Sequence, residues 1–132
     1  RLESSCKFYG IYTQITEDTY NEVKDKVVVR EMDKIIVKGR NKPVTTYELI
    51  SLSNQQPEYM DDLLPGFREA LELYRSREWK KAGALFSSLE KYEKMVPGRS
   101  TNPCRIYSER CLKYGKVPPP EDWGGVTKLT SK

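Results

Sequence analysis

The stretch IIVKGRNKPVTTYEL, residues 35–49, predicts two β-strands joined by a short turn. β-Branched residues dominate both arms, Gly39 suits a turn position with positive φ, and Pro43 fixes the entry to the second strand. The turn carries three cations, Lys38, Arg40 and Lys42. A lysine at a strand end beside a glycine can place its ammonium on a phosphate group, but hairpin turns also carry solvated lysines. The residues alone leave both interpretations of Lys38 open.

Short elements precede this hairpin. Residues 1–10, RLESSCKFYG, predict the end of a helix closed by Gly10, and residues 11–15 predict a short strand. Thr16 then caps a short helix whose first turn is acidic. Residues 27–30 and 34–38 are two separate β-branched runs, and residues 44–50 form another. Before residue 52 the chain therefore has mixed α and β character.

The pattern becomes helical after the linker-like segment SLSNQQPEYMDD, residues 51–62. Apolar residues follow helical spacing from Leu63 to Tyr74 and, after a break at Ser76, from Trp79 to Leu89. This pair resembles a tetratricopeptide repeat and must pack antiparallel. A third helix opens at Asn102 and Pro103, closes at Gly115, and is expected to turn Ile106, Tyr107 and Leu112 toward the pair. The proline-rich residues 117–126 predict an extended tail whose Trp123 packs back on the helices.

Composition limits the chemistry that this chain can perform. With no histidine, it lacks the commonest general base and metal ligand, and the cysteines Cys6, Cys104 and Cys111 form no CxxC pair. We expect reduced thiols, with Cys104 and Cys111 two turns apart on one helix. Residues 1–52 carry 9 Lys and Arg against 8 Asp and Glu, and residues 53–132 carry 14 against 11. Such mixed signs favour a solvated surface over nucleic-acid binding, and no long apolar segment predicts membrane insertion.

The first 50 residues resemble the C-terminal end of the catalytic domain of class III nucleotidyl cyclases, the adenylyl and guanylyl cyclases. The resemblance rests on the opening RLE, the ITEDTY step, and the VKG turn followed by a strand ending YEL. In that family the arginine stabilises the transition state and the lysine contacts the nucleotide triphosphate. These roles fall by motif on Arg1 as a catalytic residue and on Lys38 as a phosphate-binding residue.

The resemblance also implies which parts of the site come from elsewhere. The two metal-binding aspartates, which hold Mg or Mn in the family, and the base-selecting residues lie upstream of the motif that begins at Arg1. We therefore expect no metal or cofactor in this fragment and no cyclic nucleotide production by it alone. Four carboxylates, Glu17, Asp18, Glu31 and Asp33, could suggest a metal site, but helix-start and turn carboxylates are usually solvated, so we assign no metal to them.

Residues 60–132 resemble the helical tail that follows the cyclase domain in many bacterial adenylyl cyclases, although Gly124 stands where an acidic residue is expected. The predicted fold is thus α+β: a partial, ferredoxin-like cyclase segment with a β-hairpin at residues 1–52, a linker at 53–61, and a small all-α, repeat-like tail with an extended C-terminus at 62–132. The aromatic stripe of the tail is expected to form core, or else to present a groove to a partner.

Two functional hypotheses follow. The first is the C-terminal part of a bacterial class III adenylyl cyclase that converts ATP to cyclic AMP and pyrophosphate, working as a homodimer. The resemblance implies a cytoplasmic location, with a parent protein anchored in the inner membrane through upstream segments. The second is a non-catalytic protein-interaction module built on a degenerate cyclase end. Because the base-reading positions lie outside the chain, adenylyl and guanylyl specificity are not distinguished.

Overall fold

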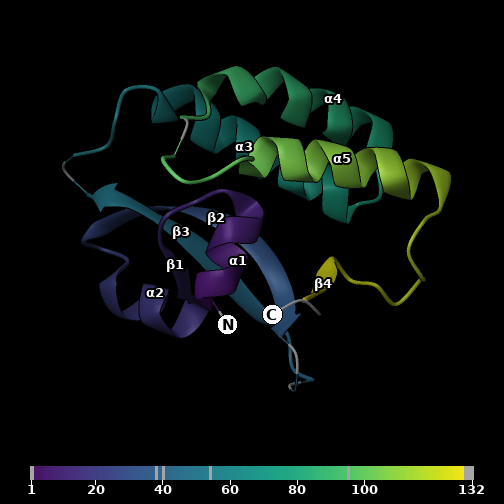
Figure 1. The fold of residues 1–132 in the computed structure, drawn as a ribbon, viewed down its shortest axis with the longest axis horizontal. Helices are drawn as coiled ribbons and strands as arrows, with labels where there is room; N and C mark the ends of the chain where they lie inside the picture. The colour runs from purple at the N-terminus through teal and green to yellow at the C-terminus, as the bar shows by residue number, and fades with distance from the viewer. Residues whose placement is uncertain (1, 38, 40, 54, 95, 130–132) are drawn as a thin grey trace. The chain divides into compact units, whose positions relative to one another are not determined.

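The computed structural model describes residues 2–37, 39, 41–53, 55–94 and 96–129. The chain divides into two compact units, which we call the sheet unit, residues 1–57 with 126–132, and the helical unit, residues 58–125. Within the described ranges there are five α-helices, a short 3-10 helix and one four-stranded sheet (Figure 1). The predicted α+β fold class, a mixed segment with a β-hairpin followed by a helical segment, is confirmed.

The sheet contains β1 (Gln14–Thr16), β2 (Val27–Val37), β3 (Val44–Leu52) and β4 (Val126–Leu129), in the order β1-β3-β2-β4. The predicted hairpin is confirmed, with β2 antiparallel to β3 and Ile35 opposite Val44. The two runs expected at residues 27–30 and 34–38 are instead one continuous strand. Register shifts between Val28 and Val29 and between Glu31 and Asp33 let β2 keep its pairing with β3 through the polar interval, as β-bulges do.

Two short helices flank these strands, α1 (Leu2–Tyr9) and α2 (Glu17–Val23). α1 ends at Gly10, whose φ of 77° places it in the left-handed region, and the Gly10 and Ile11 amides both donate to the Cys6 carbonyl. α2 begins after Thr16, whose hydroxyl accepts from the Thr19 amide. Both helix boundaries agree with the sequence signals, because each depends on contacts only a few residues apart.

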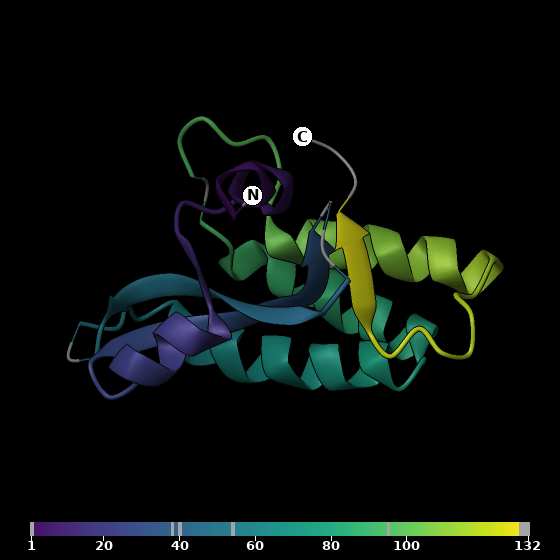
Figure 2. The same cartoon turned by 90° about the horizontal axis from the view of Figure 1, so that it is seen from below.

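The last strand, β4, was not predicted from the sequence. It follows the proline-rich segment and pairs in parallel with β2, from Lys34 opposite Val126 to Val37 opposite Leu129 (Figure 2). The chain therefore leaves the sheet unit after Pro57, forms the helical unit, and returns to the sheet unit at Val126.

The helical unit contains α3 (Met60–Arg75), α4 (Trp79–Leu89), the 3-10 helix η1 (Glu90–Tyr92) and α5 (Pro103–Lys116). Phe67 meets Phe86 with ring centroids 5.3 Å apart, and Phe86 stacks on Tyr107 at 4.9 Å. At the other end Tyr74 lies 5.7 Å from Trp79, and Trp79 lies 5.1 Å from Tyr114. Successive helices are therefore antiparallel, and most of the aromatic stripe is core, as predicted.

One face of α5 differs from the prediction. Leu112, expected to turn toward the helical pair, is 70% exposed, whereas Cys104, Tyr107 and Cys111 are buried. These three residues share one side of a helix because they are spaced by three and four, and Leu112 is rotated by about 100° from Cys111. The buried side is instead completed by α4, where Gly83 lies against Cys111.

Candidate functional site

The turn between β2 and β3 is the site that the sequence singles out. Lys38 and Arg40 lie outside the described residues, so the turn is described through its neighbours, β2, Gly39 and β3. β2 is paired with β3 as far as Ile35 and with β4 as far as Val37. Gly39 has a φ of 86°, as predicted, and a Cβ there would meet no heavy atom within 4 Å. The strand that leads into the turn is thus held by two neighbours, and the space beside Gly39 is open.

The other predicted site residue, Arg1, also lies outside the described residues, but the helix that follows it is tied to the sheet by buried polar contacts. Gln14 Nε2 donates to Ser5 Oγ at 2.5 Å, and the Tyr9 hydroxyl donates to Asp33 Oδ2. The second Asp33 oxygen accepts from the Lys34 amide at 2.8 Å. α1 is therefore held against β1 and β2 by side chains that are themselves buried.

A buried ion pair crosses the middle of the β2–β3 ladder. Arg30 and Glu48 are direct cross-strand neighbours, and Glu48 Oε1 accepts from Arg30 Nε at 2.9 Å and from Nη2 at 2.7 Å. The Arg30 side chain is 3% exposed and that of Glu48 is 13% exposed. This guanidinium is committed to a carboxylate inside the unit, so it is not a candidate for contact with a nucleotide phosphate.

The carboxylates in the described ranges do not fit a metal centre. No group of three or more Asp, Glu or Cys side chains there lies close enough to hold an ion. Glu17 and Asp18 are exposed in the first turn of α2, as expected, where they favour the positive helix end. Asp33 was expected to be solvated but is buried within β2, where it accepts a hydrogen bond from Tyr9. Within this chain, no catalytic step is therefore assigned to a bound metal.

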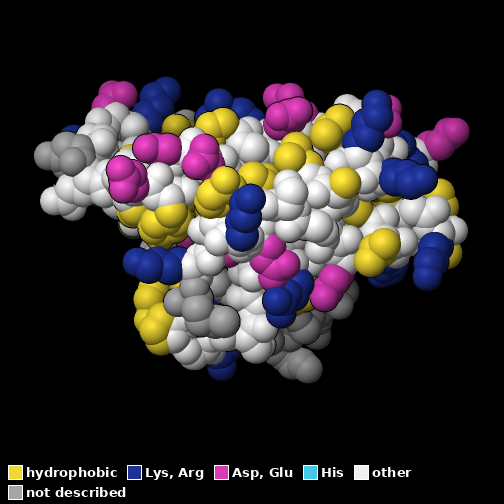
Figure 3. Space-filling view, turned by 90° about the horizontal axis from the view of Figure 1, so that it is seen from above, with side chains coloured by type: hydrophobic (Ala, Val, Ile, Leu, Met, Phe, Trp, Pro, Cys, Tyr) yellow, Lys and Arg dark blue, Asp and Glu magenta, His cyan; other side chains and the backbone are white. Residues whose placement is uncertain are grey.

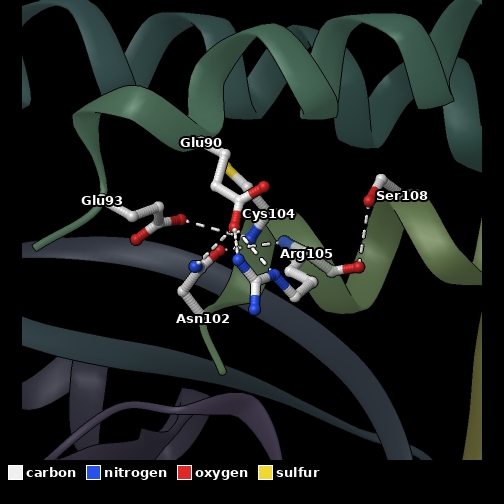
Figure 4. Close-up of polar contacts among 6 residues, drawn as sticks. All are labelled: Glu90, Glu93, Asn102, Cys104, Arg105 and Ser108. Carbon is white, nitrogen blue, oxygen red and sulfur yellow. Dashed lines mark hydrogen bonds and ion pairs between the residues drawn. The ribbon is translucent and has the colours of Figure 1, made fainter. Parts of the chain in front are cut away.

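A polar cluster that the sequence did not predict joins η1 to the start of α5 (Figure 4). Glu90 Oε2 accepts from Arg105 Nη2 at 2.7 Å, from Arg105 Nε at 2.8 Å and from Asn102 Nδ2 at 3.0 Å. Asn102 Oδ1 caps α5 by accepting from the Arg105 amide at 2.9 Å, and Glu93 Oε2 accepts from the Cys104 amide at 3.2 Å. These bonds satisfy the first amides of a helix, so the cluster is structural.

A groove of about 660 Å³ runs between α4 and α5. Its wall combines two large apolar side chains, Trp79 and the exposed Leu112, with several small residues: Gly83, Ala84, Ser87, Ser108 and Gly115. Cys111 also borders it, and burial raises the pKa of this thiol to about 11, against a smaller lowering effect of the Arg110 guanidinium. The two helical glycines were the sequence signal that could have indicated this hollow.

The surface charge agrees with the sequence-based expectation of mixed signs. Figure 3 shows Lys and Arg side chains interspersed with Asp and Glu over one face. None of the described helices is both long and apolar enough to span a lipid bilayer.

Comparison with known proteins gives one informative match. Over 121 aligned residues the chain is 26% identical to the terminal-differentiation specific adenylate cyclase of Dictyostelium discoideum. The chain is similar to an adenylate cyclase. The alignment covers 89% of this chain, which spans about 6% of the length of that relative. No protein-family model and no solved structure matches.

The extent of this similarity matters more than its level. Neither the sheet unit nor the helical unit contains 121 residues, so the alignment to the cyclase must include parts of both. A helical unit acquired from an unrelated protein would not be covered in this way. The similarity therefore concerns the sheet unit and the helical unit together.

Proposed function

We propose that this chain is the C-terminal part of an adenylate cyclase that converts ATP to cyclic AMP and pyrophosphate. The observation that carries the proposal is the similarity to an adenylate cyclase along 89% of the chain, across both units. The hairpin with its VKG turn supports it, because β2 and β3 pair as that resemblance requires.

In this proposal the Lys38 ammonium contacts the triphosphate and the Arg1 guanidinium stabilises the transition state. When the ribose 3′-oxygen attacks the α-phosphorus, the bond to pyrophosphate breaks and negative charge accumulates on phosphate oxygens. Cations held in place before the reaction stabilise that charge without reorganising. The pairing of β2 with β3 and β4 supports such a role, since it anchors the strand that leads into the turn.

The rest of the active site would come from outside this chain. The Mg or Mn ions of the parent enzyme would be held by upstream aspartates, and the parent would act as a homodimer on ATP. The chain by itself would then make no cyclic nucleotide. We also propose a cytoplasmic location for this part of the parent, whose anchoring in the inner membrane would use upstream segments.

The test is cyclic nucleotide formation by a protein extended upstream through the whole catalytic domain, with manganese and either ATP or GTP. Lys38→Ala is compared with wild type and with Lys42→Ala, a matched control that removes an exposed lysine from the same turn. We expect turnover of ATP, and a loss on the order of 2 kcal/mol in transition-state stabilisation for Lys38→Ala, as for a lost charge-assisted phosphate contact. Lys42→Ala is expected to retain activity.

Three outcomes would contradict the proposal or one part of it. A folded extended protein that is inactive with both nucleotides would favour the non-catalytic interaction module instead. Equal loss of activity in the Lys38 and Lys42 variants would mean that the turn contributes only general positive charge. Turnover of GTP in preference to ATP would change the substrate to the guanine nucleotide while keeping the reaction class.

A further inference from the structure

The groove between α4 and α5 is lined by both apolar and positively charged side chains, and the proposed cyclase role assigns no function to it. Small side chains form part of its wall, among them Gly83 and Ala84 on α4 and Ser108 on α5. Trp79 and Leu112 also line it, and Leu112 is 70% exposed although it is a large apolar residue. A hollow with an exposed apolar side chain in its wall offers contact area to a ligand.

The cations of this groove gather at one end. Gly115 packs toward Trp79, where a Cβ would lie 3.9 Å from the Trp79 Cβ, and this contact marks the end of the groove at which Lys80 and Lys116 stand. Both lysines are exposed, and neither forms an ion pair with a carboxylate in the part of the chain that the structure describes. The opposite end, at Ser87 and Ser108, is neutral.

A third cation, Arg77, is already engaged at this end. Its Nη2 donates to the Pro119 carbonyl at 3.1 Å and to the Pro120 carbonyl, and its guanidinium lies 5.6 Å from the centroid of the Trp123 ring. One carboxylate, Glu78, also lines the groove. Two available ammonium groups against one carboxylate leave this end with net positive charge, which is complementary to an acidic ligand.

The size of the groove suits a helical segment. The lining residues of α4 run from Trp79 to Ser87, which is about 12 Å of helix at 1.5 Å per residue. A docked helix covers such a length with apolar side chains spaced by four and three residues. A hollow between two antiparallel helices is also the place where a third helix packs.

We propose that the α4–α5 groove binds a short acidic amphipathic helix of a partner protein. Its apolar side chains contact Leu112 and the small residues of the groove, and its carboxylates pair with Lys80 and Lys116. The contact area is small, so the complex is weak and transient, and its rim charges make it sensitive to salt. This interaction is independent of the cyclase proposal, because none of its residues belongs to the sheet unit.

The experiment titrates the 132-residue chain with a synthetic peptide of about fourteen residues, roughly four helical turns. The peptide carries three Leu residues, the second four residues after the first and the third three residues after the second, with Glu at neighbouring positions. A second peptide has Lys in place of every Glu. Binding is followed by peptide fluorescence anisotropy and by amide NMR shifts. We expect the acidic peptide to bind and the lysine peptide not to bind. The amide chemical-shift changes should be concentrated at Gly83, Ala84, Leu112 and Gly115.

Two pairs of variants have matched controls. Lys80→Glu with Lys116→Glu should weaken binding at least about tenfold, whereas Arg68→Glu with Lys81→Glu, the same change in net charge at exposed positions that do not line the groove, should leave it nearly unchanged. Leu112→Asp should also weaken binding, and Val117→Asp should not, although Val117 is 71% exposed and so as accessible as Leu112. All six positions are exposed, so each variant is expected to fold.

Several results would overturn the proposal. These are no binding of the acidic peptide, equal binding of the two peptides, or equal weakening by the groove variants and their controls. Shifts at the groove residues that grow with protein concentration alone, and disappear in Leu112→Asp, would show that a second copy of this chain occupies the groove. That result would replace the acidic partner helix.

Discussion

At the scale of single residues, the buried Arg30–Glu48 pair shows how a charge can be held inside the sheet unit. The Glu48 carboxylate receives two N–H donors of one guanidinium across neighbouring strands. Desolvating two ions costs several kcal/mol, and a close, well-aligned pair offsets most of this cost. Removing Glu48 takes away the carboxylate that accepts two donors of the buried Arg30 guanidinium, so this buried charge loses a large part of its compensation.

We therefore predict that Glu48→Ala destabilises the sheet unit by about 3–5 kcal/mol. Replacing both partners, as Arg30→Met with Glu48→Leu, should restore most of the lost stability because no unpaired charge remains. Hydrogen exchange of the β2 and β3 amides measures both effects locally. Arg105→Ala is the comparison for an exposed pair: that side chain is 52% exposed, and losing its pair with Glu90 should cost the helical unit less than about 1 kcal/mol in tryptophan-monitored urea unfolding. A double variant no more stable than Glu48→Ala would contradict this account.

The raised pKa of the Cys111 thiol predicts how the free energy of unfolding depends on pH. Burial raises its pKa from 9.0 to about 11 in the folded protein. Well below pH 9 the thiol is protonated in both the folded and unfolded states, so it adds no pH dependence there. As pH rises from 9 toward 11, the unfolded chain loses this proton while the folded chain keeps it, and the free energy of unfolding falls.

Urea unfolding from pH 7 to 10.5 tests this sign, with Cys111→Ala as the comparison. The protein has two tryptophans, Trp79 and Trp123, and both belong to the helical unit. Their fluorescence therefore reports the unfolding of that unit. Wild type should lose more stability above pH 9 than the variant does. Other groups titrate in both proteins, so parallel curves would show that Cys111 is not the source of the pH dependence.

At the scale of secondary-structure elements, replacing a glycine by alanine should have opposite effects on stability at two positions, Gly83 on α4 and Gly115 on α5. A Cβ at Gly83 would lie 3.1 Å from the Cys111 Cβ, an atom fixed to the backbone of α5. A Cβ at Gly115 would lie 3.9 Å from the Trp79 Cβ, which is an ordinary contact. Alanine favours helix over glycine by up to about 1 kcal/mol, so only the space available decides the net effect.

We predict that Gly83→Ala destabilises the helical unit by about 1 kcal/mol, because α4 and α5 must separate by a few tenths of an ångström and lose contacts along their length. Gly115→Ala should instead stabilise it by about 0.5 kcal/mol through helix propensity. Urea unfolding followed by tryptophan fluorescence measures both. Stabilisation by Gly83→Ala would mean that the close approach at Cys111 relaxes without cost.

At the scale of the whole molecule, the order of elements along the chain makes the sheet unit depend on residues from both ends. Its last strand, β4, follows the helical unit and pairs with the final four residues of β2. Truncation after Gly125 removes β4 and leaves that edge of β2 without its parallel neighbour. The turn that follows Val37 would then be held through β3 alone.

We predict that this truncation increases hydrogen exchange in β2 between Lys34 and Val37 by about tenfold or more, the equivalent of roughly 1.4 kcal/mol. The tryptophan-monitored transition of the helical unit should change little, because Trp79 and Trp123 both remain. Removal of residues 130–132 alone is the control. Unchanged exchange after the longer truncation would mean that β4 contributes little to the stability of the sheet unit.

Much of this architecture could be predicted because its signals are local. Thr16 and Asn102 cap their helices through amides three residues away, and Gly10 and Gly39 adopt positive φ as their positions require. The apolar spacing of α3 and α4 likewise predicted their buried faces, whereas the face expected for α5 was wrong at Leu112. The site residues Arg1 and Lys38 were proposed from motif resemblance, and their roles stay predictions that the cyclase assay will test.

The sequence by itself determined the helices and the β2–β3 hairpin, the caps at Thr16 and Asn102, and the buried faces of α3 and α4, because each depends on residues close by in the chain. Only the tertiary structure decided that residues 126–129 join the sheet in parallel with β2, that one bulged strand replaces two, and that Leu112 stays exposed beside a groove. These features depend on contacts between segments far apart in the chain. Their free energy comes from fitting two surfaces together after the loop between them has closed, and neither surface alone specifies its partner.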